Sequence, residues 1–264
     1  MLVFGIIFFA AIITGLVLNT TFLVREIRRN EQQNAFLNAM THELKTPIAS
    51  IKLYLETVKT RDLPEEKRRE FYDVMLSDSD RLLNTVEQVL QASRTREKKR
   101  ELNYSDVKIA ELIAESVRVV RSRYNLVKEE IVVGDFDNDI TVEGDLSELK
   151  TAFGNLLDNA VKYSNDEINI SVRGRVRTGG WIDIYVKDNG YGIPASEVRR
   201  VFRRFYRVPN ESADNTKGTG LGLYIVESII KKHGGKVFAK SRGIGFGSTF
   251  TVRLPIKKKA DSPE

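Results

Sequence analysis

The sequence predicts a membrane-anchored protein with three parts: an N-terminal transmembrane helix, an antiparallel helical hairpin that forms a four-helix bundle in a dimer, and a two-layer α/β sandwich domain. Three observations lead to this fold class. No charged residue precedes Arg25, residues 36–97 have helical apolar periodicity, and the chain from about residue 105 alternates short strands with helices. We expect domains at 1–24, 36–97 and 105–256, linkers at 25–35 and 98–104, and a polar tail at 257–264.

Composition limits the classes of function. Of the 264 residues, 41% are hydrophobic and 30% charged, which excludes wholesale disorder. The absence of cysteine excludes disulfide scaffolds and Cys-ligated zinc or iron–sulfur sites. Two histidines, His42 and His233, are too few for a His-based metal site. The net charge of +6 favours an anionic partner without choosing among a nucleotide, a membrane surface and nucleic acid.

The N-terminal apolar run is long enough to cross a membrane. It is almost unbroken over Leu2–Leu18 and continues to Val24, and a spanning helix needs about 20 residues. The cations Arg25, Arg28 and Arg29 follow the run, so the positive-inside rule places the bulk of the chain in the cytoplasm. A buried helix of a soluble protein is one alternative. A cleaved signal peptide is another, although it should carry basic residues before its apolar core.

The next segment predicts two amphipathic helices. The first has an apolar stripe at spacings of three and four, formed by Phe36, Met40, Leu44, Ile48, Ile51, Leu55 and Val58. Pro64 suits the first turn of the second helix, where Glu65 and Glu66 suit its dipole. The second helix carries two neighbouring heptad rows, Met75-Leu82-Val89 and Leu76-Leu83-Leu90. One hairpin cannot bury faces this broad, so we expect a dimeric four-helix bundle.

A charged boundary separates the hairpin from the α/β region. The run at 94–100 (RTREKKR) is interpreted as a solvated helix end, with a nucleic-acid patch as the alternative. Beyond it, periodicity predicts helices at 109–120, 146–163 and 221–230, and strands at 131–133, 140–142, 168–172, 182–186, 237–239 and 248–254. His233 follows the last of these helices and is interpreted as a helix-end residue.

His42 is a candidate nucleophile in the segment HELKTP at 42–47. On a helix it lies about 200° from Met40, which directs it away from the apolar stripe and disfavours a buried structural histidine. Glu43 is adjacent, Thr46 lies one turn on along the same face, and Pro47 should bend the helix. An exposed imidazole beside a carboxylate can act as a nucleophile with a base. Surface histidines with acidic neighbours are common, so the pattern alone is only suggestive.

Three further segments together suggest a nucleotide site. Asn155, Asn159 and Lys162 share a helix face that can hold a phosphate-bound magnesium, or can simply be a polar face. Asp188 ends a strand and can accept a hydrogen bond from an exocyclic amine, beside glycines that let the backbone approach a flat base. GTGLGL at 218–223 leads into a helix and offers N–H groups to phosphate. No GxxxxGK[ST] motif exists, which excludes a P-loop ATPase.

In combination and in order, these segments resemble bacterial membrane-bound sensor histidine kinases of two-component systems, from about Phe36 to Pro255. HELKTP resembles the phosphoacceptor H box and NLLDNAVKYS (155–164) the N box. DNGYGIP (188–194) resembles the G1 box, VFRRFYR (201–207) the F box and GTGLGL the G2 box, and GFGSTF (245–250) resembles the terminal glycine-rich turn. The resemblance implies a dimerisation and phosphoacceptor bundle followed by a Bergerat-type ATP-binding domain.

The resemblance also implies roles for individual residues. His42 would be phosphorylated, Glu43 would assist its proton loss, and Thr46 would position water to dephosphorylate the partner. Asn159 would ligate Mg²⁺. The remaining residues implied to bind ATP are Asn155, Lys162, Tyr163, Asp188, Gly190, Gly192, Arg207, Lys217, Gly218, Thr219, Gly220, Leu221 and Gly222. Asp188 would take the adenine amino group, while Lys162, Arg207 and Lys217 would reach the phosphates.

The implied function is ATP-dependent autophosphorylation of His42 and transfer of the phosphoryl group to an aspartate of a response regulator, with phosphatase action on that partner. The resemblance implies a homodimer in the inner membrane of a bacterium, with a single span, a cytoplasmic catalytic region and no nucleic-acid partner. One alternative is a catalytically inactive membrane-anchored scaffold of the same fold. Another is a gyrase-like or chaperone-like clamp, although those lack a two-helix block that presents a histidine.

Two features depart from the family pattern. Tyr191 stands where a small aliphatic residue is expected in the G1 box, which could alter the pocket wall. Only one span is visible, and about ten residues separate Arg25 from the first bundle helix. We interpret this as a truncated piece or as a protein in which the span and a partner do the sensing.

Overall fold

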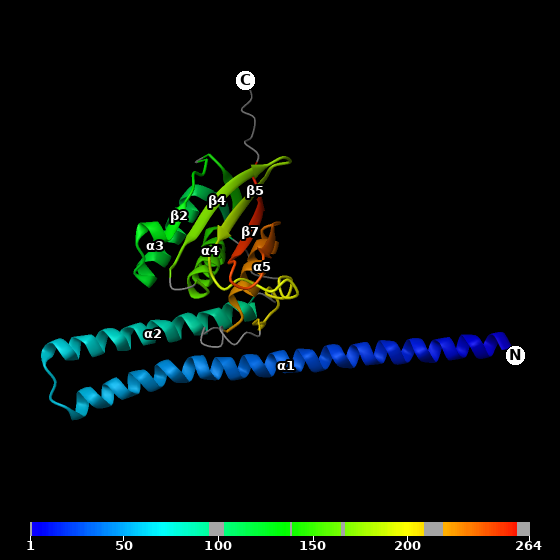
Figure 1. The fold of residues 1–264 in the computed structure, drawn as a ribbon, viewed down its shortest axis with the longest axis horizontal. Coiled ribbons are helices and arrows are strands. Elements are labelled where there is room, and N and C mark those ends of the chain that lie inside the picture. The colour runs from blue at the N-terminus through cyan, green and yellow to red at the C-terminus, as the bar shows by residue number, and fades with distance from the viewer. Residues whose placement is uncertain (1, 95–102, 138, 165–166, 209–218, 258–264) are drawn as a thin grey trace, which may run out of the picture.

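The computed structural model describes residues 2–94, 103–137, 139–164, 167–208 and 219–257 (Figure 1). Two long helices, α1 (Leu2–Thr60) and α2 (Glu65–Arg94), form a hairpin. An α/β domain lies beside α2, and the N-terminal half of α1 extends well past it (Figure 1). Residues 95–102, in the expected linker, and 258–264, in the expected tail, are outside the described residues.

Helix α1 is continuous from the apolar run into the hairpin. The expected linker at 25–35 is helical and does not interrupt it, because polar residues such as those of EIRRNEQQN are good helix formers. Its segment Val3–Glu31 is long and apolar enough to span a membrane and is not covered by any other part of the structure. Pro47 lies within the helix and is buried. Helix α2 begins after Pro64, whose carbonyl accepts from Arg68 N–H at 3.1 Å, as expected for a proline near a helix start.

The hairpin partly covers one of the two predicted heptad rows of α2 and leaves the other exposed. Tyr54 and Phe71 pack across it with ring centroids 4.7 Å apart, and Glu43 pairs with Arg81 at 2.9 Å. The row Met75-Leu82-Val89 is half-buried, and Val89 also packs against the α/β domain. In contrast, Leu76, Leu83 and Leu90 are 64%, 60% and 48% exposed. One chain therefore leaves an apolar row of α2 uncovered.

The α/β domain has a five-stranded sheet covered on one face by three helices. The strand order is β2-β4-β5-β7-β6, and only the β2–β4 pair is parallel. The strands are β2 (Ile131–Val133), β4 (Ile170–Arg177), β5 (Trp181–Lys187), β6 (Lys236–Ser241) and β7 (Ser248–Pro255). The covering helices are α3 (Ile109–Tyr124), α4 (Leu146–Lys162) and α5 (Gly222–Lys232). Their apolar faces and the inward strand residues form one core.

A second, two-stranded sheet pairs β1 (Tyr104–Lys108) with β3 (Thr141–Asp145). All helices and strands expected in this region are present, but β1 was not predicted and falls at the end of the expected linker. Its sequence YSDVK buries only Val107, so no alternation indicates a strand. His233 ends α5 as expected and is buried, where its Nε2 accepts from Asp145 N–H at 3.0 Å. This contact joins the small sheet to α5.

The outer face of the large sheet is organised around Asp183. Along β5, Ile182, Ile184 and Val186 point into the core, which directs Asp183 to the other face. Asp183 is nevertheless 1% exposed, because Arg253 Nε and Arg177 Nε donate to its two oxygens at 2.6 and 2.9 Å. These hydrogen bonds lower the pKa of Asp183 to about 2.

We predict that Asp183→Asn destabilises the α/β domain by about 2 kcal/mol at neutral pH, the free energy that corresponds to a pKa depressed from 3.8 to about 2. Because the folded-state pKa is depressed, this stability is present above about pH 4 and is lost as the pH falls towards about 2. Urea unfolding at several pH values, followed by the fluorescence of Trp181, measures it. An acid limb of the stability curve that is identical in mutant and wild type would contradict the assignment.

Candidate functional site

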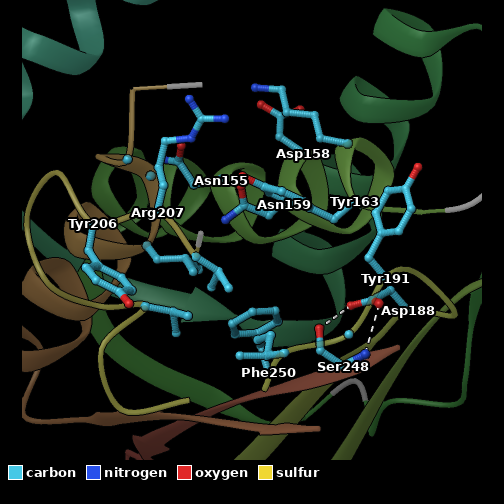
Figure 2. A pocket seen from close by; sticks show the side chains of 18 of the residues that line it. Asn155, Asp158, Asn159, Tyr163, Asp188, Tyr191, Tyr206, Arg207, Ser248 and Phe250 are labelled. Atoms are coloured by element: carbon cyan, nitrogen blue, oxygen red, sulfur yellow. Dashed lines mark hydrogen bonds between the residues drawn. The ribbon is translucent and has the colours of Figure 1, made fainter. Parts of the chain in front are cut away.

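An open cavity lies between α4, the loop after β5, residues 201–208, the start of α5 and the start of β7. Figure 2 shows polar side chains of α4 on one side of it and Asp188, Ser248 and Phe250 on the opposite side. The cavity brings together residues that the sequence analysis took from four separate motifs, the N, G1, F and G2 boxes. The predicted residues that line it are Asn155, Asn159, Lys162, Tyr163, Asp188, Gly192, Arg207, Thr219, Gly220 and Gly222.

Asp188 is a buried carboxylate at the end of β5, held by several hydrogen bonds. Its Oδ1 accepts from the backbone N–H groups of Gly190 and Ser248 at 3.0 and 2.9 Å. Its Oδ2 accepts from the Ser248 hydroxyl at 2.5 Å (Figure 2). A buried carboxylate is costly to desolvate unless it is hydrogen-bonded, and these donors supply the bonds. The remaining lone pair on Oδ2 can accept from a ligand that enters the cavity.

The G1 loop approaches other backbone segments too closely for side chains at two positions. A Cβ on Gly190 would lie 1.8 Å from Tyr163 O, where the loop is fastened by Tyr191 N–H donating to that carbonyl at 3.0 Å. Gly192 has φ +74°, and its Cβ would lie 2.0 Å from Gly243 O. The glycine-rich turn also binds the loop, because Gly247 N–H donates to Gly190 O at 2.9 Å. The predicted glycine-rich segments therefore build one rigid wall.

Helix α4 presents its polar face to the cavity. The amide nitrogen of Asn155 donates to Thr151 O at 3.0 Å, which leaves its oxygen directed towards Gly222 at the start of α5. Asn159 lies one turn further along and Lys162 is exposed in the last turn. Asp158, which was not predicted, also lines the cavity and pairs with Arg123 at 2.8 Å. Burial raises the pKa of Asp158, and the Arg123 charge opposes that rise.

The start of α5 is built to receive an anion. Its N-cap residue Leu221 makes no side-chain cap bond, and Gly222 in the first turn lines the cavity. Unpaired N–H groups and the positive end of the helix dipole favour a phosphate there. Phe205 N–H donates to Gly220 O at 3.0 Å, which ties the predicted F box to the G2 loop. Phe205 adopts φ 64°, a strained value for a bulky residue, and it does so at this junction.

The F box supplies a further wall of the cavity through Val201, Tyr206 and Arg207. The Tyr206 hydroxyl donates to Glu197, and Arg200 pairs with the same carboxylate at 3.0 Å while its guanidinium lies 4.9 Å from the Tyr206 ring centroid. Burial and the Glu197 carboxylate raise the pKa of Tyr206 to about 12. Burial also raises the pKa of Tyr163, and the nearby Arg207 opposes that rise. Arg207 thus lies near the Tyr163 hydroxyl and places a positive charge at the cavity.

Several predictions need comment. Gly190 and Leu221 were predicted to bind ATP but are not among the residues that line the cavity. Leu221 is instead fully buried in the core. Lys217 and Gly218 lie outside the described residues. Tyr191 does line the cavity, so the departure from the expected small residue changes its wall. The sequence analysis did not identify these lining residues: Asp158, Ile193, Val201, Tyr206, Val208, Leu223, Ser248 and Phe250. All of these except Val208 lie inside the quoted motifs, which is the one signal that could have found them.

The second candidate site is on the hairpin. His42 is exposed on α1, as its angle from the apolar stripe predicts. The Thr46 hydroxyl donates to His42 O at 3.1 Å and so lies one turn on, along the same face. The Glu43 side chain is 11% exposed and accepts from Arg81 Nη2 at 2.9 Å. Arg81 was not predicted, and it holds the Glu43 carboxylate against α2.

The donor set for a metal consists of amide oxygens. Within the residues that the structure describes, no group of three or more His, Cys, Asp or Glu could hold an ion. Asn155 and Asn159 offer neutral oxygens on one face of α4. That set is too small to hold a metal alone, but it fits Mg²⁺ carried with phosphates, which supply most of its ligands.

Comparison with known proteins assigns a family to both the hairpin and the α/β domain. Residues 32–98 match the His Kinase A (phospho-acceptor) domain, and residues 144–258 match the histidine kinase-, DNA gyrase B- and HSP90-like ATPase family. The sensor-like histidine kinase SenX3 of Mycolicibacterium smegmatis is 33% identical over 232 residues, covering 86% of this chain and 59% of SenX3. The SenX3 proteins of three mycobacterial strains give similar values, so the chain spans little more than half the length of these relatives.

Two solved structures are also similar. The mycobacterial sensor histidine kinase MprB is 31% identical with a TM-score of 0.50, covering 59% of this chain and 99% of the MprB chain. Full-length ShkA in complex with AMPPNP is 26% identical with a TM-score of 0.60, covering 85% of this chain and 46% of ShkA. A hairpin that exposes a histidine therefore precedes an α/β domain of the histidine kinase-, DNA gyrase B- and HSP90-like ATPase family. The chain belongs to the sensor histidine kinase family.

We predict that Ser248→Ala weakens Mg-ATP binding by roughly tenfold to a hundredfold, because a hydrogen bond to a charged group contributes about 1.5–3 kcal/mol. The mutation removes the hydroxyl that orients Asp188. Titration calorimetry measures the affinity. Thr249→Ala is the matched control, because the next residue of β7 points to the outer face of the sheet. Equal losses in both variants would mean that Ser248 acts through strand stability alone.

Proposed function

We propose that this protein is an ATP-dependent protein-histidine kinase that phosphorylates its own His42 and passes the phosphoryl group to an aspartate of a response regulator. We include dephosphorylation of that regulator in the proposal. The observation that carries it is a pocket that joins the hydrogen-bonded Asp188 carboxylate to the start of helix α5 at Gly222, in the same chain as an exposed hairpin histidine.

The two ends of the pocket suit the two ends of ATP. Asp188 offers a carboxylate to the exocyclic amine of adenine, and the backbone at Gly192 allows a flat base to lie close. At the other end, Lys162, Arg207 and the N–H groups of α5 offer positive charge to the phosphates. ShkA, a relative of similar fold, is described in complex with AMPPNP, which supports ATP as the ligand here.

Asn159, with Asn155 beside it, would hold Mg²⁺ together with the phosphates. When bound, the metal ion supplies charge neutralisation at the phosphates. The other pocket residues would hold the nucleotide in position. The Asp188 bonds fix the base end, and the F box contact between Phe205 and Gly220 fixes the wall beside the phosphate end. Phosphoryl transfer depends largely on such positioning and on charge stabilisation.

On the hairpin, an imidazole nitrogen of His42 would form the bond to the γ-phosphorus as the bond from that phosphorus to the bridging oxygen breaks and ADP leaves. Glu43 would accept or orient the imidazole proton, held by Arg81. The Thr46 hydroxyl, anchored on the His42 carbonyl, would orient water for hydrolysis of the partner's phosphoaspartate. The residues that line the pocket lie between 155 and 250, so His42 must reach it by a change in the placement of the α/β domain or from a second chain.

A homodimer accounts for the uncovered apolar row of α2. Leu76, Leu83 and Leu90 repeat every seven residues and are exposed in one chain, so a second hairpin would cover them in a four-helix bundle. We also propose that Val3–Glu31 anchors the protein in the inner membrane of a bacterium by a single span, with the catalytic region in the cytoplasm.

An inactive scaffold and a gyrase-like clamp are the competing functions. Intact His42, Asn159 and Asp188 argue against the scaffold, and the hairpin with an exposed histidine argues against the clamp. Incubation with ATP labelled in the γ-phosphate separates the three. The proposal expects label on the protein that is labile to acid and stable to alkali, as a phosphohistidine is.

We predict that His42→Gln abolishes this label and leaves Mg-ATP affinity unchanged, because His42 is on α1 and the pocket is built by the α/β domain. Asn159→Ala should also lose the label, but with weakened Mg-ATP binding. Filter-bound radioactivity measures the label, and calorimetry on the same preparations measures the Mg-ATP affinity. Undiminished acid-labile label in His42→Gln would refute the phosphoacceptor assignment.

We predict that a fragment comprising residues 31–264 is dimeric at micromolar concentration and that Leu83→Glu makes it monomeric. Each large apolar side chain buried contributes roughly 1.5–3 kcal/mol, so a few per protomer offset the estimated 4–15 kcal/mol cost of association. Lys52→Glu is a control change on the hairpin surface, where the lysine is largely exposed. Sedimentation equilibrium measures the state. A monomeric wild-type fragment would mean that the apolar segment before residue 31 holds the dimer together.

A further inference from the structure

The outer face of the five-stranded sheet carries a concentration of positive charge that the proposed kinase reaction does not use. This basic sheet face contains seven cations and one carboxylate, Asp183, by the alternation and register of β4, β5, β6 and β7. The cations are Arg173, Arg175, Arg177, Lys187, Lys236, Lys240 and Arg253. The whole chain has a net charge of +6, so the rest of the protein is balanced overall.

The cations of the basic sheet face are available to a ligand. Asp183 is buried between Arg177 and Arg253, and its negative charge forms ion pairs with those two guanidinium groups. It therefore does not neutralise the other cations of the face. Arg173 and Arg175 are exposed on β4 and have no ion-pair partner in the part of the chain that the structure describes. The same holds for Lys187 on β5 and for the β6 lysines. The face is therefore an array of unneutralised charge on a rigid scaffold.

Aromatic side chains accompany these charges. Phe238 is 39% exposed on β6, and the Arg253 guanidinium lies 5.6 Å from its ring centroid. Trp181 begins β5 on the same face, opposite Arg177. Aromatic rings beside basic side chains are the composition that settles at the headgroup level of a bilayer.

The hairpin brings the α/β domain to the membrane side of the molecule. The contacts Glu43–Arg81 and Tyr54–Phe71 define an antiparallel register in which the end of α2, Arg94, lies level with about residue 30 of α1. At 1.5 Å per residue, that level is only about 8 Å from Arg25, where the apolar run ends. The eight residues 95–102 extend at most about 29 Å, so the domain that begins at Asn103 stays near this boundary.

We propose that the basic sheet face docks on the anionic phospholipid headgroups of the membrane in which α1 is anchored. The inference rests on the proposed membrane anchor, which keeps the domain within reach of a negative surface potential. Anionic lipid is favoured over nucleic acid because the face is a flat sheet beside a span, whereas duplex DNA is read by elements that enter its grooves. The nucleotide cavity opens among α4, α5 and β7 on the helix-covered side, so docking leaves it accessible.

The experiment uses the whole chain in lipid nanodiscs and needs no label on the protein, because Trp181 is the only tryptophan. Discs contain phosphatidylcholine with a nitroxide on its headgroup, with or without about one-third phosphatidylglycerol. We expect Trp181 fluorescence to be quenched in the anionic discs at 0.1 M salt, and the quenching to be lost in zwitterionic discs and at 1 M salt, where the Debye length falls to about 3 Å.

Two matched double variants identify the surface. Arg173→Gln/Arg175→Gln should lower the ratio of docked to undocked domain about thirtyfold, since each basic residue near an anionic membrane contributes roughly a fivefold preference. Arg118→Gln/Lys128→Gln removes the same charge from exposed positions on α3 and the turn after it, and should leave the quenching unchanged. Equal effects of the two variants would overturn the proposal, because they would reflect net charge alone.

Other outcomes also contradict it. Equal quenching in both kinds of disc, or none in either, would mean that the face does not recognise anionic lipid. Quenching absent in anionic discs, together with a Trp181 response to added duplex DNA at 0.15 M salt, would identify a nucleic-acid surface instead. Elution of the chain with the discs tests the anchor separately, and labelled ATP tests kinase activity in the same sample. If the chain does not elute with the discs, the proposed anchor is wrong. Quenching of Trp181 is then measured after spin-labelled vesicles that contain phosphatidylglycerol are added to the chain.

Discussion

The burial of the Asp188 carboxylate is the constraint on which the nucleotide pocket depends. A carboxylate that is 4% exposed is stable only with donors on both oxygens, and the donors come from the start of β7 and from the G1 loop. Those bonds hold the loop against the end of α4, where Gly190 has no room for a side chain beside Tyr163. Strand, loop and helix are thus brought to one point, and they define the end of the cavity that is proposed to hold the base.

The end of the cavity proposed to hold the phosphates is organised differently, by backbone groups. The N-cap residue of α5, Leu221, makes no side-chain cap bond, and the F box reaches the preceding loop through Phe205, whose N–H donates to Gly220 O. The positive φ of Phe205 is a local cost that the surrounding packing must offset, and Arg204 lies 4.4 Å from its ring centroid. A strained residue at this junction is consistent with a wall that changes when a nucleotide binds.

The hairpin and the α/β domain divide the chemistry between them. The hairpin holds His42 in the open, with Glu43 fixed by Arg81, and it leaves an apolar row for a second copy. The domain contacts α2 through α5 and through Val89, near the end of that helix. The contact is confined to the end of α2, and the proposed docking of the basic sheet face would add a second contact at the membrane surface.

The sequence by itself determined the parts whose signals are local. Heptad rows and the apolar run define the helices, alternation defines most strands, and contiguous motifs identify His42, Asn159, Asp188 and the glycine loops. Only the tertiary structure decided which heptad row is covered, and that Ser248, Tyr206 and Phe250 line the cavity. The Asp188–Ser248 bond joins residues 60 positions apart, and Arg81 reaches Glu43 across 38. Periodicity reports which face of an element is apolar. It does not report which distant side chain completes a hydrogen bond, because that partner is chosen by how the elements pack.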